Sequence, residues 1–360
     1  MKTLILILPI FLIIGFNAIA QNDSTVKPLT ISGYIETYYS YDFNNPTDHN
    51  RPGFVYSHNR HNEVNLNLGF VKAAYKTKKV RSNLALMTGT YTNANLAAEP
   101  NVLKNIFEAN AGIKLSNTKN LWIDAGIFAS HIGFESAIGK DCFTLTRSIL
   151  ADNSPYYQSG AKLSYTSDNE KLFVSGLFLN GWQRIQRLDG NNTPSFGHQV
   201  TYRPNSKITL NSSSFIGSDT PDSTRQMRYF HNFYAQLQLN PKLSLIAGFD
   251  IGAQQKLKRS SNYNIWFTPI IITKYSPSEK VSIVARGEYY SDVSGVIIST
   301  GTTNGFQTYG YSLNFDYSIT TNIMWRIEAR GLTSKDNIFT LNNKPSTQNY
   351  FTTTSLAISF

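Results

Sequence analysis

The residues best suited to acid–base chemistry gather in one segment of the chain, residues 129–156. Among its residues are a histidine, acids and serines that could act together: His131, Glu135, Asp141, Ser130 and Ser136. Such a set could serve an ester or lipid hydrolase, but the sequence offers no nucleophile elbow around either serine. The histidines His58, His61 and His131 also lack the close spacing of metal ligands. The sequence therefore predicts no catalytic centre, no metal site and no cofactor.

Charged residues recur at every second position in two stretches near the C-terminus. They are Arg286 and Glu288 in one stretch and Arg326, Glu328 and Arg330 in the other. Because successive side chains of a β-strand point to opposite faces, each stretch puts its charges on one face. These charges could form a girdle that sets the field across a pore. They could equally form mutually neutralising ion pairs that stiffen a wall, and the sequence leaves both interpretations open.

The last residues of the chain, 350–360, show the clearest strand pattern. Counting back in twos from Phe360 places Ile358, Leu356 and Tyr350 on one face, opposite serine, threonine and alanine side chains. About ten tilted residues with one apolar face are what a transmembrane barrel strand needs. The stretch resembles the closing strand of a bacterial outer-membrane barrel. That resemblance implies that Phe360, Ile358 and Leu356 form the signal read by the barrel assembly machinery.

The same alternation repeats from residue 29 onward, between connections that are alternately long and short. In the second segment, for example, Val64, Leu66, Leu68 and Phe70 share one face. We count about sixteen such segments, within a range of fourteen to eighteen. Bacterial single-chain barrels have even strand numbers, short periplasmic turns and long extracellular loops. The sequence therefore predicts an all-β, antiparallel transmembrane β-barrel over residues 29–360.

The N-terminus has the features of a secretory signal peptide. A positively charged start precedes an apolar run that reaches Phe16, and small residues end it at Ala18 and Ala20. This order predicts a cleaved signal peptide over residues 1–20 and a short periplasmic tail over residues 21–28. An even strand count puts both termini on the periplasmic side. We therefore expect a multi-pass protein of the bacterial outer membrane.

The composition fits a membrane barrel better than a soluble domain. Aromatic residues make up 13% of the chain and charged residues only 16%, against about 25% charged residues in an average soluble domain. The formal net charge is +10, but the basic excess falls in the expected connections, so it predicts contact with anionic lipopolysaccharide and not anion selectivity. The expected partners are outer-membrane lipids and lipopolysaccharide, the barrel assembly machinery and small hydrophilic solutes, with no nucleic acid.

Segment 129–156 is the longest connection and is too apolar for a solvated loop. Its large apolar residues are Ile132, Phe134, Ile138, Phe143, Leu145, Ile149 and Leu150. Inside a barrel the surface available to bury them is the lumen wall, so we expect the segment to fold inward and narrow the channel. The predicted constriction places three of its charges opposite the wall: Glu135, Asp141 and Arg147 facing Arg286, Glu288, Arg326, Glu328 and Arg330. A cap on the rim or an oligomer contact is the alternative.

Several short stretches spread along the sequence carry a family resemblance. They read SGYIE at 32–36, SHIGFESA at 130–137, LTRSILADNSPYY at 145–157, SG at 159–160 and NGW at 180–182. These stretches are similar to those of the β-barrel porin family described as OmpL-like, which is common in Bacteroidota. The resemblance spans nearly all of the chain after residue 20. It implies an outer-membrane channel, and it supplies no substrate and no site residues.

The sequence favours a porin, a passive diffusion channel for small hydrophilic solutes or ions, over an enzyme. One alternative is a barrel-embedded lipid or ester hydrolase, which would depend on His131. Another is a plugged barrel that acts as an adhesin or a structural protein, which would not conduct. The sequence does not distinguish a monomer from a trimer.

Overall fold

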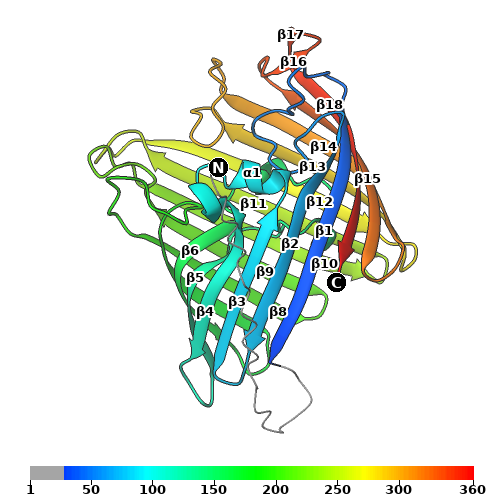
Figure 1. The fold of residues 1–360 in the computed structure, drawn as a ribbon. Helices are drawn as coiled ribbons and strands as arrows, with labels where there is room; N and C mark the ends of the chain where they lie inside the picture. The colour runs from blue at the N-terminus through cyan, green and yellow to red at the C-terminus, as the bar shows by residue number, and fades with distance from the viewer. Residues whose placement is uncertain (1–27) are drawn as a thin grey trace, which may run out of the picture.

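The computed structural model describes residues 28–360, which form a closed antiparallel β-barrel (Figure 1). The first eight strands of the wall are β1 (Leu29–Asp42), β2 (Val64–Lys76), β3 (Val80–Thr88), β4 (Ile106–Lys114), β5 (Asn120–Ala129), β6 (Tyr157–Thr166), β7 (Leu172–Leu179) and β8 (Ser195–Asn205). The other eight are β9 (Ile208–Gly217), β10 (Arg228–Asn240), β11 (Leu243–Gln255), β12 (Tyr263–Tyr275), β13 (Val281–Asp292), β14 (Phe306–Ser318), β15 (Ile323–Ser334) and β18 (Gln348–Ser359). The prediction of an all-β barrel of sixteen strands is confirmed.

The predicted signal peptide, residues 1–20, and residues 21–27 of the predicted tail lie outside the described residues. From residue 28 onward, every wall strand pairs with its neighbours along the chain, and β18 closes the barrel between β15 and β1. Short turns gather at one end of the barrel and long loops at the other (Figure 1). A small hairpin of β16 (Phe339–Leu341) and β17 (Lys344–Ser346) extends from the long-loop end.

The seam between the first and last strands is held by the C-terminal residue. Gly33 donates its amide to the carbonyl of Phe360 at 2.7 Å, and the amide of Phe360 donates back to Gly33 at 3.0 Å. The ring of Phe360 lies so close to Gly33 that a β-carbon there would overlap it. Glycine at position 33 therefore lets the terminal aromatic ring cover the seam.

The outer face of the wall is apolar and the inner face is polar, as the period-two pattern predicts. On β14, Tyr309, Tyr311 and Leu313 are exposed on the outside, whereas Asn314 and Asp316 are buried on the inside. Charged side chains on the lipid face cost about 2 to 4 kcal/mol at the membrane midplane. The inward position of the charges therefore fixes which face of each strand meets lipid.

The predicted face of β2 is wrong from Leu68 onward, because the strand carries a β-bulge at Asn67. The pairing of β1 with β2 shifts between Glu36 and Thr37, so that Leu66 pairs with Thr37 while Leu68 pairs with Glu36. An extra residue in one strand reverses the faces that follow it. Leu68 and Phe70 consequently point into the barrel with Glu36, although strict alternation from Val64 placed them outside.

Helical structure is confined to the connections. It comprises α1 (Thr90–Asn95), α2 (Ile149–Asp152) and the 3-10 turns η1 (Asn101–Asn105) and η2 (Gly139–Asp141). Over residues 28–360, none of the helices has both the length and the apolar character needed to cross a membrane. The turn η2 and the helix α2 belong to residues 129–156, which join β5 to β6 and which we call the inner segment.

Candidate channel constriction

The inner segment first contacts the inner face of β9 and β10. The Nε2 atom of His131 lies 2.8 Å from the carbonyl of Ser214, and Ser213 donates its hydroxyl to the carbonyl of His131 at 2.7 Å. Further along, the amide of Gly133 donates to the Asn232 side chain at 3.2 Å. The backbone of the segment thus finds its hydrogen-bond partners on the barrel wall, as a polar backbone withdrawn from water must.

The candidate acid–base residues are held apart by these contacts. Burial lowers the pKa of His131 to about 4, so its ring is neutral near pH 7 and donates to Ser214. The hydroxyl of Ser130 accepts from the amide of Ile132, and the hydroxyl of Ser136 donates to the carbonyl of Ile138. Within residues 28–360, neither serine is hydrogen-bonded to His131, and no cluster of histidine, cysteine and acidic side chains has metal-site geometry.

Four charged side chains on β13 and β15 form an alternating quartet beneath the inner segment. Arg286 Nη2 lies 2.8 Å from Glu328 Oε1 and Arg286 Nε lies 3.4 Å from Glu288 Oε1. Arg330 forms an ion pair with the same Glu288 oxygen. All four side chains are buried. The quartet is electrically neutral, so its members can leave water together without an uncompensated charge.

The quartet also binds the backbone of the inner segment. Glu328 accepts the amide of Thr146 at 2.6 Å, and Glu288 accepts the amide of Ile149 at 2.6 Å. In return Arg286 donates to the carbonyl of Thr146 at 2.7 Å, and Arg330 donates to the carbonyl of Arg147 at 2.7 Å. Hydrogen bonds to charged groups contribute roughly twice as much as neutral ones. These bonds fix residues 146–149 on the wall.

Arg326 on β15 is a second attachment point for the inner segment. Its Nε atom lies 2.6 Å from Asp316 Oδ1 on β14. The rest of the guanidinium donates to four carbonyls of the segment, those of Gly139, Cys142, Phe143 and Thr144, at 2.7 to 3.2 Å. Because guanidinium presents five donors in a fixed plane, one side chain can hold a whole turn of backbone.

The inner segment is also bonded to itself. Arg147, which is fully buried, donates to the carbonyls of Ser136, Leu145 and Ala137 at 2.7, 2.7 and 3.3 Å. Glu135 accepts the amide and hydroxyl of Ser148, the N-cap residue of α2. The two halves of the segment are therefore joined, and it packs on the wall as one compact unit.

The structure separates the residues predicted for the constriction into two groups. Glu135 and Asp141 border an open cavity. The remaining residues are buried between the inner segment and the wall, and they border none of the cavities described below: Arg147, Arg286, Glu288, Arg326, Glu328 and Arg330. These six side chains lie where the segment meets the wall, because the backbone of the segment needs buried polar partners and they supply them.

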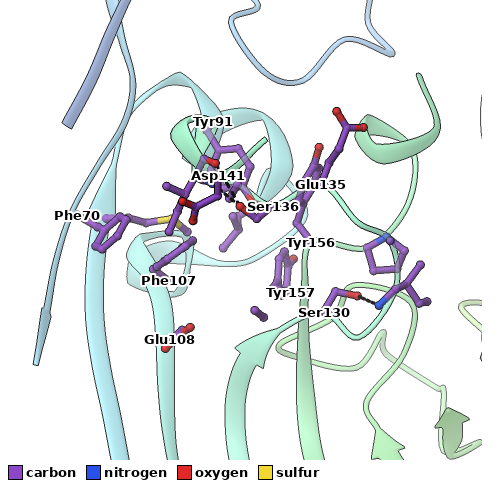
Figure 2. A pocket seen from close by; sticks show the side chains of 18 of the residues that line it. Phe70, Tyr91, Phe107, Glu108, Ser130, Glu135, Ser136, Asp141, Tyr156 and Tyr157 are labelled. Atoms are coloured by element: carbon purple, nitrogen blue, oxygen red, sulfur yellow. Dashed lines mark hydrogen bonds between the residues drawn. The ribbon is translucent and has the colours of Figure 1, made fainter. Parts of the chain in front are cut away.

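Open space remains on the other side of the inner segment, against β2 to β4. A cavity of about 300 Å³, which we call the aromatic cavity, lies between these strands and residues 129–141 (Figure 2). Its rings come from the wall, the helix α1 and the inner segment: Phe70, Tyr91, Phe107, Phe134, Tyr156, Tyr157 and Tyr234. The lining also includes Lys72 and Glu108, whose charged groups lie 2.6 Å apart.

A second cavity of about 330 Å³, the polar cavity, continues along the inner face of β2 to β7. It is lined mainly by charged and amide side chains: Lys72, Arg81, Asn83, Glu108, Asn110, Asp124 and Lys162. Arg81 donates hydrogen bonds from Nε and Nη2 to the two carboxylate oxygens of Asp124. The two cavities share Lys72, Glu108 and Ala129. The two cavities are therefore adjacent, and we call them together the conduit.

Sequence reasoning missed the aromatic rings and Lys72 as lining residues. Phe70 and Lys72 follow the bulge of β2, so strict alternation assigned them to the wrong face. The available signal was local: Lys72 can avoid lipid only by pointing inward, and the residue two before it then points inward as well. In the sequence, Tyr156 and Tyr157 are notable only as the end of the stretch 145–157, which carries the family resemblance.

A wide antiparallel barrel whose longest connection packs on the inner wall and leaves cavities beside it has the architecture of the porin class. The chain belongs to a family of such proteins, the beta-barrel porin-2, OmpL-like family, whose model matches residues 28–360. The resemblance found in the sequence is confirmed. The protein is an outer-membrane porin.

The fold is similar to solved outer-membrane barrels. The outer membrane channel DcaP of Acinetobacter baumannii superposes with a TM-score of 0.61 at 8% identity, covering 92% of this chain and 97% of that chain. The anion-selective porin from Comamonas acidovorans superposes with a TM-score of 0.60 at 8% identity, covering 92% of this chain and 99% of that chain. The trimer form of OmpT of Vibrio cholerae superposes with a TM-score of 0.58 at 9% identity, covering 92% of this chain and 99% of that chain. At these identities the likeness shows the fold alone, and no curated protein matches the sequence.

Proposed function

We propose that the protein lets small hydrophilic solutes and ions diffuse passively across the outer membrane, and that the conduit is their path. The observation that supports this proposal is that two cavities lie side by side along the inner wall and share Lys72, Glu108 and Ala129 in their linings. The inner segment packs on β9, β10 and β13 to β15, so the passage follows the opposite part of the wall. The inner segment then sets the width of the channel.

The charges along the conduit are close to balance. Lys72, Arg81 and Lys162 are basic, and the acids are Glu108, Asp124, Glu135 and Asp141. The net charge of +10 for the whole chain therefore does not describe the passage. Because the charges in the polar cavity are largely paired, neutral solutes and ions of both signs are expected to enter it.

The finer topology follows from the same proposal. Short turns and both termini would face the periplasm, and long loops would face outward, where their basic residues would meet lipopolysaccharide. The exposed side chains of Phe360 and Leu356, with Ile358, would be read by the barrel assembly machinery. Each barrel contains its own conduit, so the proposal holds equally for a monomer and for a trimer.

We propose no catalytic role for this barrel. A hydrolase would need a serine activated by His131, and both candidate serines bond to backbone atoms of the inner segment instead. The histidine contacts Ser214 of the wall, where it positions the segment. A plugged adhesin would need the inner segment to fill the lumen, and the two cavities beside the segment favour a channel over a plug.

Liposome swelling tests the proposed function directly. Liposomes that contain the refolded protein are expected to swell quickly in a pentose, more slowly in a disaccharide and hardly at all in a larger oligosaccharide, because the conduit admits only small solutes. Liposomes prepared with heat-unfolded protein serve as the control. Equal and negligible swelling in all three sugars, from protein shown to be folded, would contradict a diffusion channel.

A further inference from the structure

The aromatic cavity contains a carboxylate that has no partner in the protein. Asp141 ends the turn η2 and is exposed, and within the described chain its side chain makes no hydrogen bond and no ion pair. It shares the cavity with Phe70, Tyr91 and Phe107, as Figure 2 shows. An unpaired carboxylate beside aromatic rings is an unusual combination in a passage whose other charges are mostly paired.

Most of the other polar groups of this cavity are already engaged. The hydroxyl of Tyr157 donates to Glu99 at 2.9 Å, and that of Tyr156 lies 3.4 Å from an oxygen of Asp152. Glu135 is bonded to Ser148, and Lys72 is paired with Glu108. A polyol needs many free donors and acceptors to replace its water, and this cavity offers few. Sugars are therefore poor candidates for binding here.

The sign of the charge separates the remaining candidates. The aromatic cavity is lined by Glu108, Glu135 and Asp141 against the single base Lys72, so an anion would meet net repulsion. An ammonium group would be attracted by Asp141 and by the faces of the aromatic rings, which carry negative charge density. An apolar body attached to that ammonium would fill the space between the rings.

We propose that the aromatic cavity is a binding site for small organic cations that carry an apolar or aromatic body. The proposal deepens the proposed channel function and rests on it, because the site lies on the solute path. A volume of about 300 Å³ is at the lower end of known small-molecule pockets. Asp141 neutralises the cation, and the aromatic lining, which includes the mutually stacked rings of Phe70 and Phe107, contacts its apolar part.

The probe is benzyltrimethylammonium, with benzoate as an anion of similar shape. Added to one side of a bilayer, benzyltrimethylammonium is expected to interrupt the open-channel current at concentrations at which benzoate does not. Asp141→Asn should weaken this block about tenfold, since it removes one close charge pair worth about 1.4 kcal/mol. Phe107→Leu keeps the charge and should weaken the block severalfold. Glu170→Gln, which neutralises an exposed carboxylate in a turn outside the conduit, should leave it unchanged.

Saturation-transfer NMR on the refolded protein in detergent measures the same binding without requiring conduction. Transfer to benzyltrimethylammonium that is lost in Asp141→Asn supports the site, even if the barrel proves silent and the channel proposal fails. Open channels that benzoate and benzyltrimethylammonium block equally would overturn the cation site while leaving the channel function intact. An unchanged affinity in Asp141→Asn would overturn it as well.

Discussion

Replacing Ile138–Ile149 with a short glycine–serine linker raises the single-channel conductance about two- to threefold, because conductance follows the open cross-section of a pore. The deletion removes the part of the inner segment that covers the wall from β13 to β15. The wall tolerates its loss, since Arg286 keeps Glu328 and Arg326 keeps Asp316 as ion-pair partners. The measurement is the current step in a planar bilayer at fixed salt.

Shortening the β16–β17 hairpin by removing residues 340–345 is the matched control. These residues are exposed at the far end of the long loops and border neither cavity of the conduit. Their loss should leave the current step unchanged. If both deletions gave the conductance of the parent protein, the inner segment would not be what narrows the passage.

Substituting Arg326→Leu has the second-largest expected effect. It removes the ion pair with Asp316 together with the hydrogen bonds to the four carbonyls of residues 139–144. Breaking a buried ion pair by deleting one partner costs about 3 to 5 kcal/mol, because the other charge stays buried and unpaired. We expect the inner segment to detach at times, which would add large, brief current steps and open Lys140 and Arg147 to trypsin.

Mass spectrometry after limited trypsin digestion measures the second of these effects. In the parent protein Arg147 is fully buried, so cleavage after it should be slow. Arg203→Leu is the matched control, because Arg203 is exposed and its side chain makes no hydrogen bond or ion pair within residues 28–360. Equal cleavage rates in the parent, Arg326→Leu and Arg203→Leu would show that Arg326 does not hold the segment.

The barrel itself could be predicted from the sequence because its determinants are local. Each strand has to put apolar side chains in lipid and charges in the lumen, so the faces of β14 follow from residues 309–317 alone. The strand number follows from repeating that pattern. The inward fold expected for the inner segment rested on composition, because residues such as Leu145 and Ile149 need a surface to cover them.

The roles of individual charged residues could not be predicted in the same way. Period two placed Arg326 and Glu328 in the lumen, but the path of the inner segment determines whether water or backbone covers them. That path depends on contacts between residues far apart in the chain, such as His131 with Ser214. The lining position of Lys72 depends on one bulge, which strict alternation from Val64 does not register; only the charge of Lys72 marks the reversed face.

The central claim is that the inner segment narrows the lumen and leaves an open conduit, and single-channel current through the refolded protein in a planar bilayer tests it most directly. Under a salt gradient we predict discrete open steps with a reversal potential displaced slightly from zero in the cation-selective direction, since the conduit is lined by four acids and three bases. Silence from protein shown to be folded would contradict the claim, because it would mean that the segment closes the barrel.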